Sequence, residues 1–162
     1  MRKGPGRVLF HLAASLVGLA AAPAAMAQAP EWRVMMEMGK PGDRALLLVD
    51  GRSLLSPTRD TRTVDVSSFY STIQTDDIKP YNVIRLTYRF DCRAKTGQRI
   101  REVILHDDKQ LSRIEAVNPM APVKPGTLQG DLIGPVCSGN FSTFPRITAA
   151  TPALERKRRF GR

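Results

Sequence analysis

The clearest pattern of hydrophobic and polar positions lies between Tyr81 and Cys92. Every second position points to one side of an extended chain: Ile84, Leu86, Tyr88, Phe90 and Cys92. The positions between them are polar: Arg85, Thr87, Arg89 and Asp91. This alternation has the period of a strand, and a helix cannot place the first five residues on one side. We therefore predict a strand over 81–92 whose cysteine points into the core.

Further strand-like runs cover residues 32–38, 45–49, 53–55, 61–72, 99–106 and 111–117. Turn signals separate them, among them Asp50-Gly51, the preferred dipeptide of a tight hairpin. Consecutive strands joined by short turns predict an antiparallel meander of about five or six strands. Polar residues alternate along several of the runs, which suits a sheet with one face in water.

The pattern changes after three prolines, Pro119, Pro122 and Pro125. Thr127 is a suitable N-cap for a short helix over 128–133. Gly130 and Pro135 weaken that helix, so it needs tertiary support. Residues 138–162 lack periodicity and are predicted to form a disordered basic tail. The fold class is therefore α+β and mainly β, with one domain over 28–137.

The first 27 residues have the three parts of a secretory signal peptide. Arg2, Lys3 and Arg7 precede an apolar core of about 15 residues, shorter than the roughly 20 residues that span a bilayer. Ala25 and Ala27 give the small-x-small pattern of a cleavage site. We predict cleavage between Ala27 and Gln28, no transmembrane segment in the mature chain, and a location in the periplasm or outside the cell. The alternative for this segment is a membrane anchor.

The net charge of +10 does not indicate a basic folded domain. The signal segment contributes three of these charges, and residues 155–162 contribute five bases against one acid. The remaining body carries a net charge of only about +3, so we expect no specific nucleic-acid binding.

The mature chain contains two cysteines, Cys92 and Cys137. An even number in an oxidising compartment predicts one disulfide bond. The chain-entropy model gives a loop of this length a stabilisation of about 4 kcal/mol. A redox-active pair is the alternative, but the C-x-x-C spacing is missing.

Two basic clusters are candidate binding surfaces. Arginines on neighbouring strands could form a positive patch for acidic polymers or an acidic protein: Arg85, Arg89, Arg99 and Arg101. The tail run could bind an anionic lipid or polymer surface: Arg156, Lys157, Arg158 and Arg159. The simpler interpretations are a solvated sheet face and a tail that only aids solubility.

The sequence offers little catalytic chemistry. His106 is the single histidine of the mature chain, so a nucleophile activated by a histidine base would have to use it. No serine lies in the G-x-S-x-G motif of a nucleophile elbow. Asp76-Asp77 and Asp107-Asp108 lack the ligand spacing of a calcium loop and fall where turns are expected. We predict no catalytic residues, no metal and no cofactor. An enzyme or enzyme inhibitor that uses the turn at His106 and Asp107 is the alternative.

Several short motifs resemble the surface-adhesin protein E-like family of small exported bacterial proteins. They are Trp32 after the signal segment, Val49-Asp50 with Ser53-Leu54, Arg89-Phe90-Asp91-Cys92, and Pro125-Gly126-Thr127 followed by Leu132 and Val136-Cys137. The resemblance implies a bent antiparallel sheet with a C-terminal helix packed on one face. It also implies binding of host matrix or serum proteins, although residue 28 is Gln where a lipid-anchored member would have Cys.

These observations together predict an exported, non-enzymatic binding or structural module of the bacterial cell envelope. Its partner would be a protein or another envelope component.

Overall fold

The computed structural model describes residues 29–75, 79–115 and 118–161. The predicted signal segment and its cleavage site at Ala27 and Gln28 lie outside the described residues. Among those residues, no helix is both long and apolar enough to cross a membrane.

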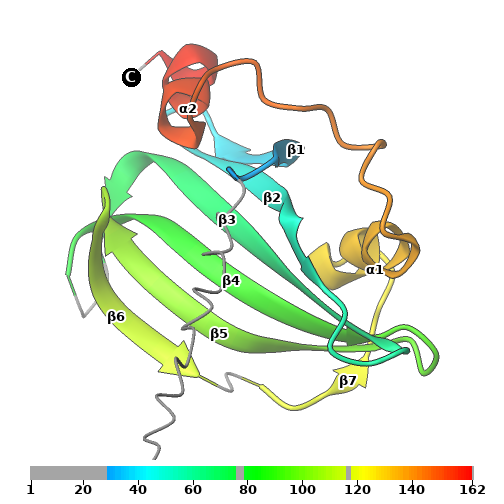
Figure 1. The fold of residues 1–162 in the computed structure, drawn as a ribbon. Helices are drawn as coiled ribbons and strands as arrows, with labels where there is room; N and C mark the ends of the chain where they lie inside the picture. The colour runs from blue at the N-terminus through cyan, green and yellow to red at the C-terminus, as the bar shows by residue number, and fades with distance from the viewer. Residues whose placement is uncertain (1–28, 76–78, 116–117, 162) are drawn as a thin grey trace, which may run out of the picture.

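Seven strands and two helices make up the described chain (Figure 1). The strands are β1 (Trp32–Lys40), β2 (Asp43–Leu55), β3 (Thr61–Gln74), β4 (Tyr81–Asp91), β5 (Thr96–His106), β6 (Lys109–Glu115) and β7 (Ala121–Pro122). The helices are α1 (Leu128–Ser138) and α2 (Pro152–Phe160).

The strands form one antiparallel sheet in sequence order from β1 to β6, and β7 adds to β5 beside the start of that strand. This topology confirms the predicted meander and the mainly β fold class. Figure 1 shows that the sheet is strongly bent, with α1 and α2 placed against different parts of it.

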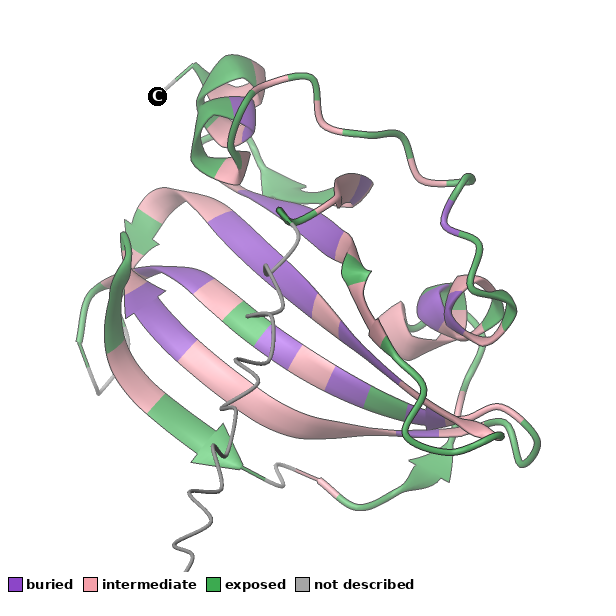
Figure 2. Cartoon of the chain, in the orientation of Figure 1, coloured by how far each residue is buried: buried purple, intermediate pink, exposed green. Residues whose placement is uncertain are grey.

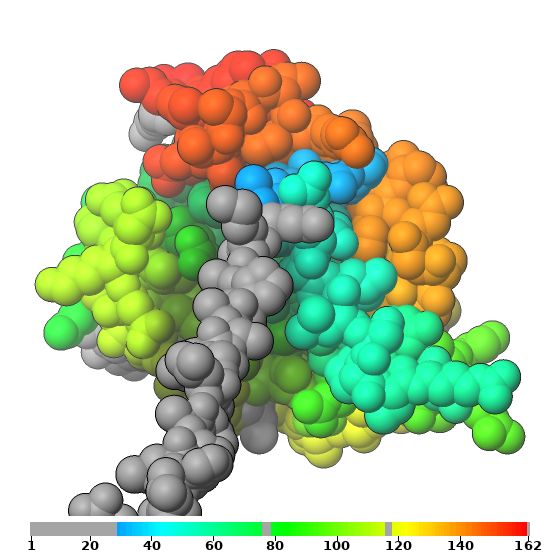
Figure 3. Space-filling model, in the orientation of Figure 1, coloured from blue at the N-terminus to red at the C-terminus, as the bar shows by residue number. Residues whose placement is uncertain are grey.

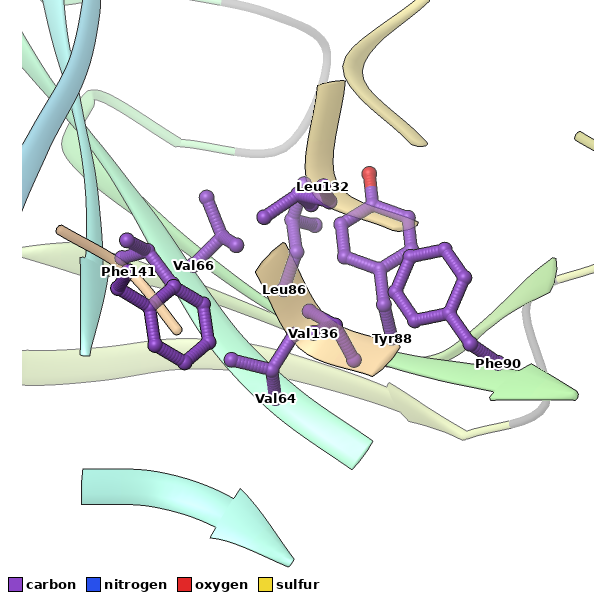
Figure 4. Close-up of a cluster of buried hydrophobic side chains, with 9 residues drawn as sticks. Val64, Val66, Leu86, Tyr88, Phe90, Leu132, Val136 and Phe141 are labelled. Carbon is purple, nitrogen blue, oxygen red and sulfur yellow. The ribbon is translucent and has the colours of Figure 1, made fainter. Parts of the chain in front are cut away.

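One face of the sheet, called here the convex face, carries the larger hydrophobic core. The even-numbered positions of β3 and β4 point to this side, as the alternation from Ile84 to Phe90 predicts. Helix α1 covers it with Leu132 and Val136, which are both fully buried. Figure 4 shows these two side chains lying among the strand residues Val64, Val66, Leu86, Tyr88 and Phe90.

Two local features hold α1 on the convex face. The Thr127 side chain accepts a hydrogen bond from the backbone nitrogen of Gly130 at 3.1 Å, which confirms the predicted N-cap. The disulfide Cys92–Cys137 ties the helix to the end of β4. Cys92 itself is half-buried and follows the last residue of the strand. With this support the helix continues through Pro135 to Ser138, five residues beyond its predicted end.

The opposite face, called here the concave face, is apolar where helix α2 lies. Leu46, Leu48, Phe69, Val83 and Leu105 form a second buried cluster, and Trp32 and Phe160 pack against it. Helix α2 contacts β2 and β3. In Figure 3 this C-terminal segment, in orange and red, lies directly against β1, in blue.

The prediction of a disordered tail over 138–162 was wrong for the part that the structure describes. Pro145 and Ile147 form backbone hydrogen bonds with Val34 and Trp32 of β1, which attach the segment after α1 to the sheet edge. Thr151 then caps α2, and Glu155 of that helix is fully buried. Long-range contacts and caps therefore order a segment whose sequence has no marked periodicity.

The predicted hairpin at Asp50-Gly51 was also wrong. Strand β2 continues through this dipeptide, and the chain turns only after Leu55. The Ser53 hydroxyl donates to the Asp50 carbonyl and accepts from the Asp65 backbone nitrogen, both at 2.7 Å. This side chain bridges an irregular stretch of the β2–β3 pairing, so the dipeptide forms an irregularity within a strand and not its end.

Burial along the sheet shows which part of the concave face is open. Figure 2 shows buried residues concentrated in the central strands, while β6 is exposed or half-buried along its length. The part of the concave face that α2 leaves uncovered lies over β2 to β6.

Candidate ligand-binding pocket on the concave face

A row of polar side chains crosses the concave face from β2 to β6. The strand register places these residues opposite one another in turn: Asp50, Asp65, Thr87, Arg101 and Glu115. Trp32 extends the row onto β1, where it is paired with Asp50. The row lies next to the apolar cluster beneath α2, so the concave face has one apolar end and one polar end.

A hollow of about 490 Å³ lies over this row. Trp32 of β1 and Arg113 of β6 both line it, together with residues of the four strands between them. In a flat sheet, strands spaced about 4.8 Å apart would place these two edges roughly 24 Å from each other. The bend of the sheet therefore brings its two edges around one pocket, whose size is typical of small-molecule sites.

Two half-buried carboxylates lie on one side of the pocket. Asp50 and Asp65 are directly opposite each other on β2 and β3. Asp50 accepts hydrogen bonds from the backbone nitrogens of Glu31 and Arg52, at 2.8 and 3.0 Å, and Asp65 accepts one from the Thr87 hydroxyl at 2.6 Å. Neither carboxylate forms an ion pair with any residue that the structure describes. Like charges directly opposite each other destabilise an antiparallel pair, so this arrangement has a cost for folding.

Ser67 lies between the polar row and the apolar cluster. Its neighbours across the sheet are Leu48 and Arg85. Only 1% of the residue is exposed, and its hydroxyl has no hydrogen-bond partner within the described chain. A buried polar group without a partner costs about 1–3 kcal/mol, and such groups are rare in folded proteins. Ser67 also lines the pocket, so a bound molecule is a natural partner for this hydroxyl.

The opposite side of the pocket is basic. Arg85 is exposed, and no ion pair or hydrogen bond of its side chain is found among the described residues. Arg101 and Arg113 also line the pocket, but both contact Glu115. The hydrogen bond from Arg113 holds the pKa of the Glu115 carboxyl below its ordinary value, and the charge of Arg101 acts in the same direction. Arg85 is therefore the guanidinium that remains available to a ligand.

The predicted basic patch is only partly assembled. Arg85 and Arg101 share the concave face, and both line the pocket. Arg89 has the same orientation by register with Thr63, but it lies beyond the pocket. Arg99 is paired with Tyr88 and lies on the convex face, where it forms an ion pair with Glu102. A register shift after Thr87 explains this, because one additional residue reverses the side to which later side chains point.

Three of the four basic residues assigned to the tail are engaged within the protein. Arg156 donates a hydrogen bond to the Tyr70 carbonyl at 2.9 Å. Arg158 and Arg159 both bind Glu155, and Arg159 also reaches Glu37 on β1. The contacts with Tyr70 and Glu37 fasten α2 to the sheet. Lys157 is exposed, and no hydrogen bond or ion pair of its side chain is found among the described residues.

The turn at His106 and Asp107 has the features of a structural turn. Asp107 has a positive φ of 52° and its carboxylate accepts a hydrogen bond from Asn82, while its backbone nitrogen donates to the same side chain. His106 Nδ1 lies 2.9 Å from the Pro80 carbonyl oxygen. Within the described ranges, no group of three or more His, Cys, Asp and Glu side chains is placed to hold a metal ion.

Sequence reasoning missed most of the pocket. Asp50 was assigned to a turn, and Ser67 and Arg113 carried no signal beyond strand alternation. Asp65 and Ser67 do occupy the alternate positions of 61–72 that face away from Val64 and Val66. That polar face was the available indication, but its partners come from strands whose register had to be known.

Comparisons with protein-family models, with curated proteins and with solved structures found no match for this chain. The pocket therefore has to be interpreted from its own residues.

Proposed function

We propose that the protein is an exported, non-enzymatic binding module of the bacterial cell envelope, and that it holds a small polar ligand in the concave pocket. The observation that carries this proposal is the Ser67 hydroxyl, which is buried, lacks a partner in the described chain and lines the hollow. A ligand that supplied the missing hydrogen bond would repay part of the cost of burying it.

Further features support this proposal. The hollow is lined by residues of six hydrogen-bonded strands, which hold its walls in place for a ligand. The pocket contains charged groups that the protein leaves unpaired. The signal-like N-terminal segment supports export. The resemblance to surface-adhesin E-like proteins adds a binding role, but binding of host proteins stays a prediction.

The test is recovery of a ligand from envelope extracts. Mature protein is incubated with the small-molecule fraction of an envelope extract, and native mass spectrometry records any added mass. In the Ser67→Leu variant the leucine side chain fills the floor of the pocket, so we expect its mass spectrum to show no bound ligand. Ser112→Leu is the matched control, because the Ser112 hydroxyl is also buried without a partner but lies on the convex face.

The wild-type protein and the Ser112→Leu variant should show the same added mass, while the Ser67→Leu variant should show the mass of the protein without a ligand. Thermal unfolding of all three proteins shows whether each is folded. If Ser67→Leu is folded and still carries the ligand, or if the wild type acquires none, the pocket is not the binding site proposed here.

A further inference from the structure

The charges in the pocket are separated by strand. The unpaired carboxylates Asp50 and Asp65 lie on β2 and β3, and the three guanidiniums lie on β4, β5 and β6. Two acidic residues are exceptions: Asp108, an exposed residue of the β5–β6 turn at the rim of the pocket, and Glu115 of β6, which is paired with Arg101 and Arg113. A neutral ligand would leave both charged sides unmatched, and a ligand of a single charge would leave one side unmatched.

From this separation we propose, resting on the proposed function, that the ligand is a small zwitterion. Its ammonium group lies between Asp50 and Asp65, and its carboxylate or phosphate lies against Arg85. An ammonium between the two carboxylates removes the like-charge repulsion of the empty pocket. The anionic group gives Arg85 the partner that it lacks among the described residues, in a bond that is stronger than one between neutral groups.

Two neighbouring side chains fit the two ends of such a ligand. Trp32 is the partner of Asp50 across β1 and β2 and lines the pocket, where its ring also packs edge-on against Phe69. Aromatic rings attract cations through their faces. Ser67 is the direct neighbour of Arg85 across β3 and β4, so its hydroxyl is placed to donate to the same anionic group.

The spacing sets the length of the ligand. Asp50 and Arg85 are separated by two strand spacings, roughly 10 Å across the sheet. The geometry therefore favours charges several bonds apart, as in a dipeptide or a phosphoethanolamine headgroup, over the adjacent charges of a single α-amino acid.

Blocked dipeptides test each charge separately. Calorimetric titration of the mature protein uses four probes: alanyl-alanine, its N-acetyl form, its C-terminal amide and glycerophosphoethanolamine. Loss of one charge-assisted contact is expected to weaken binding about tenfold or more. Tighter binding of alanyl-alanine indicates a peptide source for the ligand, and tighter binding of glycerophosphoethanolamine indicates a lipid headgroup.

Charge-specific variants identify the side chain that recognises each end. The Asp65→Asn variant should bind alanyl-alanine and its N-acetyl form equally well. The Arg85→Met variant should bind alanyl-alanine and its C-terminal amide equally well. Asp131→Asn and Arg93→Met are the controls, since both residues are exposed and do not line the pocket. Both controls should bind like the wild type.

The inference is overturned if neither zwitterion binds at millimolar concentration, or if the blocked forms bind as well as alanyl-alanine. The proposed function is tested apart from it. An extract ligand that binds the wild type and not Ser67→Leu would uphold a pocket function even when every zwitterion probe fails.

Discussion

Asp50 and Asp65 face each other directly across β2 and β3, half-buried on the concave face, and neither is paired with a cation among the described residues. Proteins rarely keep such a like-charge pair for stability, because each charge raises the energy of the other. The arrangement is understandable where the two carboxylates bind a positively charged group.

Replacing one carboxylate should therefore stabilise the empty protein. Asp65→Asn keeps an oxygen that accepts the Thr87 hydroxyl and removes the repulsion. We expect its free energy of unfolding to rise by about 0.5 kcal/mol at low ionic strength, with a smaller gain at high salt. Urea denaturation at two salt concentrations measures this. A loss of stability at both would show that the pair is not a source of repulsion.

Breaking the disulfide should release α1 from the convex face. The Cys92→Ser, Cys137→Ser double variant removes the tie between β4 and the helix. We expect a loss of about 2–4 kcal/mol in the free energy of unfolding, and weaker protection of α1 amides from hydrogen exchange. If the double variant were as stable as the wild type, Leu132 and Val136 alone would be enough to hold α1.

Acid should loosen α2 through Glu155. The hydrogen bond from Arg158, with further ones from Arg159, Ala149 and Thr148, holds the pKa of the Glu155 carboxyl far below its ordinary value of 4.5. The unfolded chain therefore takes up a proton near pH 4.5 while the folded protein does not. The stabilisation is complete above that pH and is lost progressively as the pH falls below it.

Glu155→Gln should reduce both the stability at neutral pH and its dependence on acid. Loss of the charge leaves Arg158 and Arg159 without their buried partner, which we expect to cost about 2 kcal/mol at pH 7. Denaturation curves from pH 7 to pH 3 should show a flatter acid slope than the wild type. Glu102→Gln, on the convex face, serves as the comparison, and equal slopes in all three proteins would rule out this role of Glu155.

Export through the predicted signal peptide should give a mature protein with one defined N-terminus. Protein recovered from cell fractions should begin at Gln28, lie outside the cytoplasm and resist alkylation of its two cysteines. Intact-mass analysis before and after reduction measures the N-terminus and the thiol state together. A product that retained Met1, or that carried two alkylated thiols without reduction, would remove the basis for an envelope role.

The sequence was sufficient to predict the meander, because alternation over 81–92 and the turn signals depend on local chemistry. The Thr127 cap and the cysteine pair were accessible for the same reason. The structure of residues 139–161 could not be predicted, because its order comes from contacts of Pro145, Ile147 and Arg159 with β1, which is far away in the sequence. A single register shift after Thr87 was enough to place Arg99 on the other face from Arg101.

The pocket could not be predicted for a related reason. Its residues come from six strands, and only the bend of the sheet brings Trp32 and Arg113 to the same hollow. Strand periodicity predicts which face of the sheet a residue occupies, but it does not predict how that face is curved.

The most direct test of the pocket is an amide spectrum of isotope-labelled mature protein, recorded as the small-molecule envelope fraction is added. We predict that the largest shifts fall on Asp65, Ser67, Arg85 and Thr87, and that α1 is unaffected. Shifts confined to α2 or to the outer edge of β6, or no shifts at all, would contradict a binding site on the concave face.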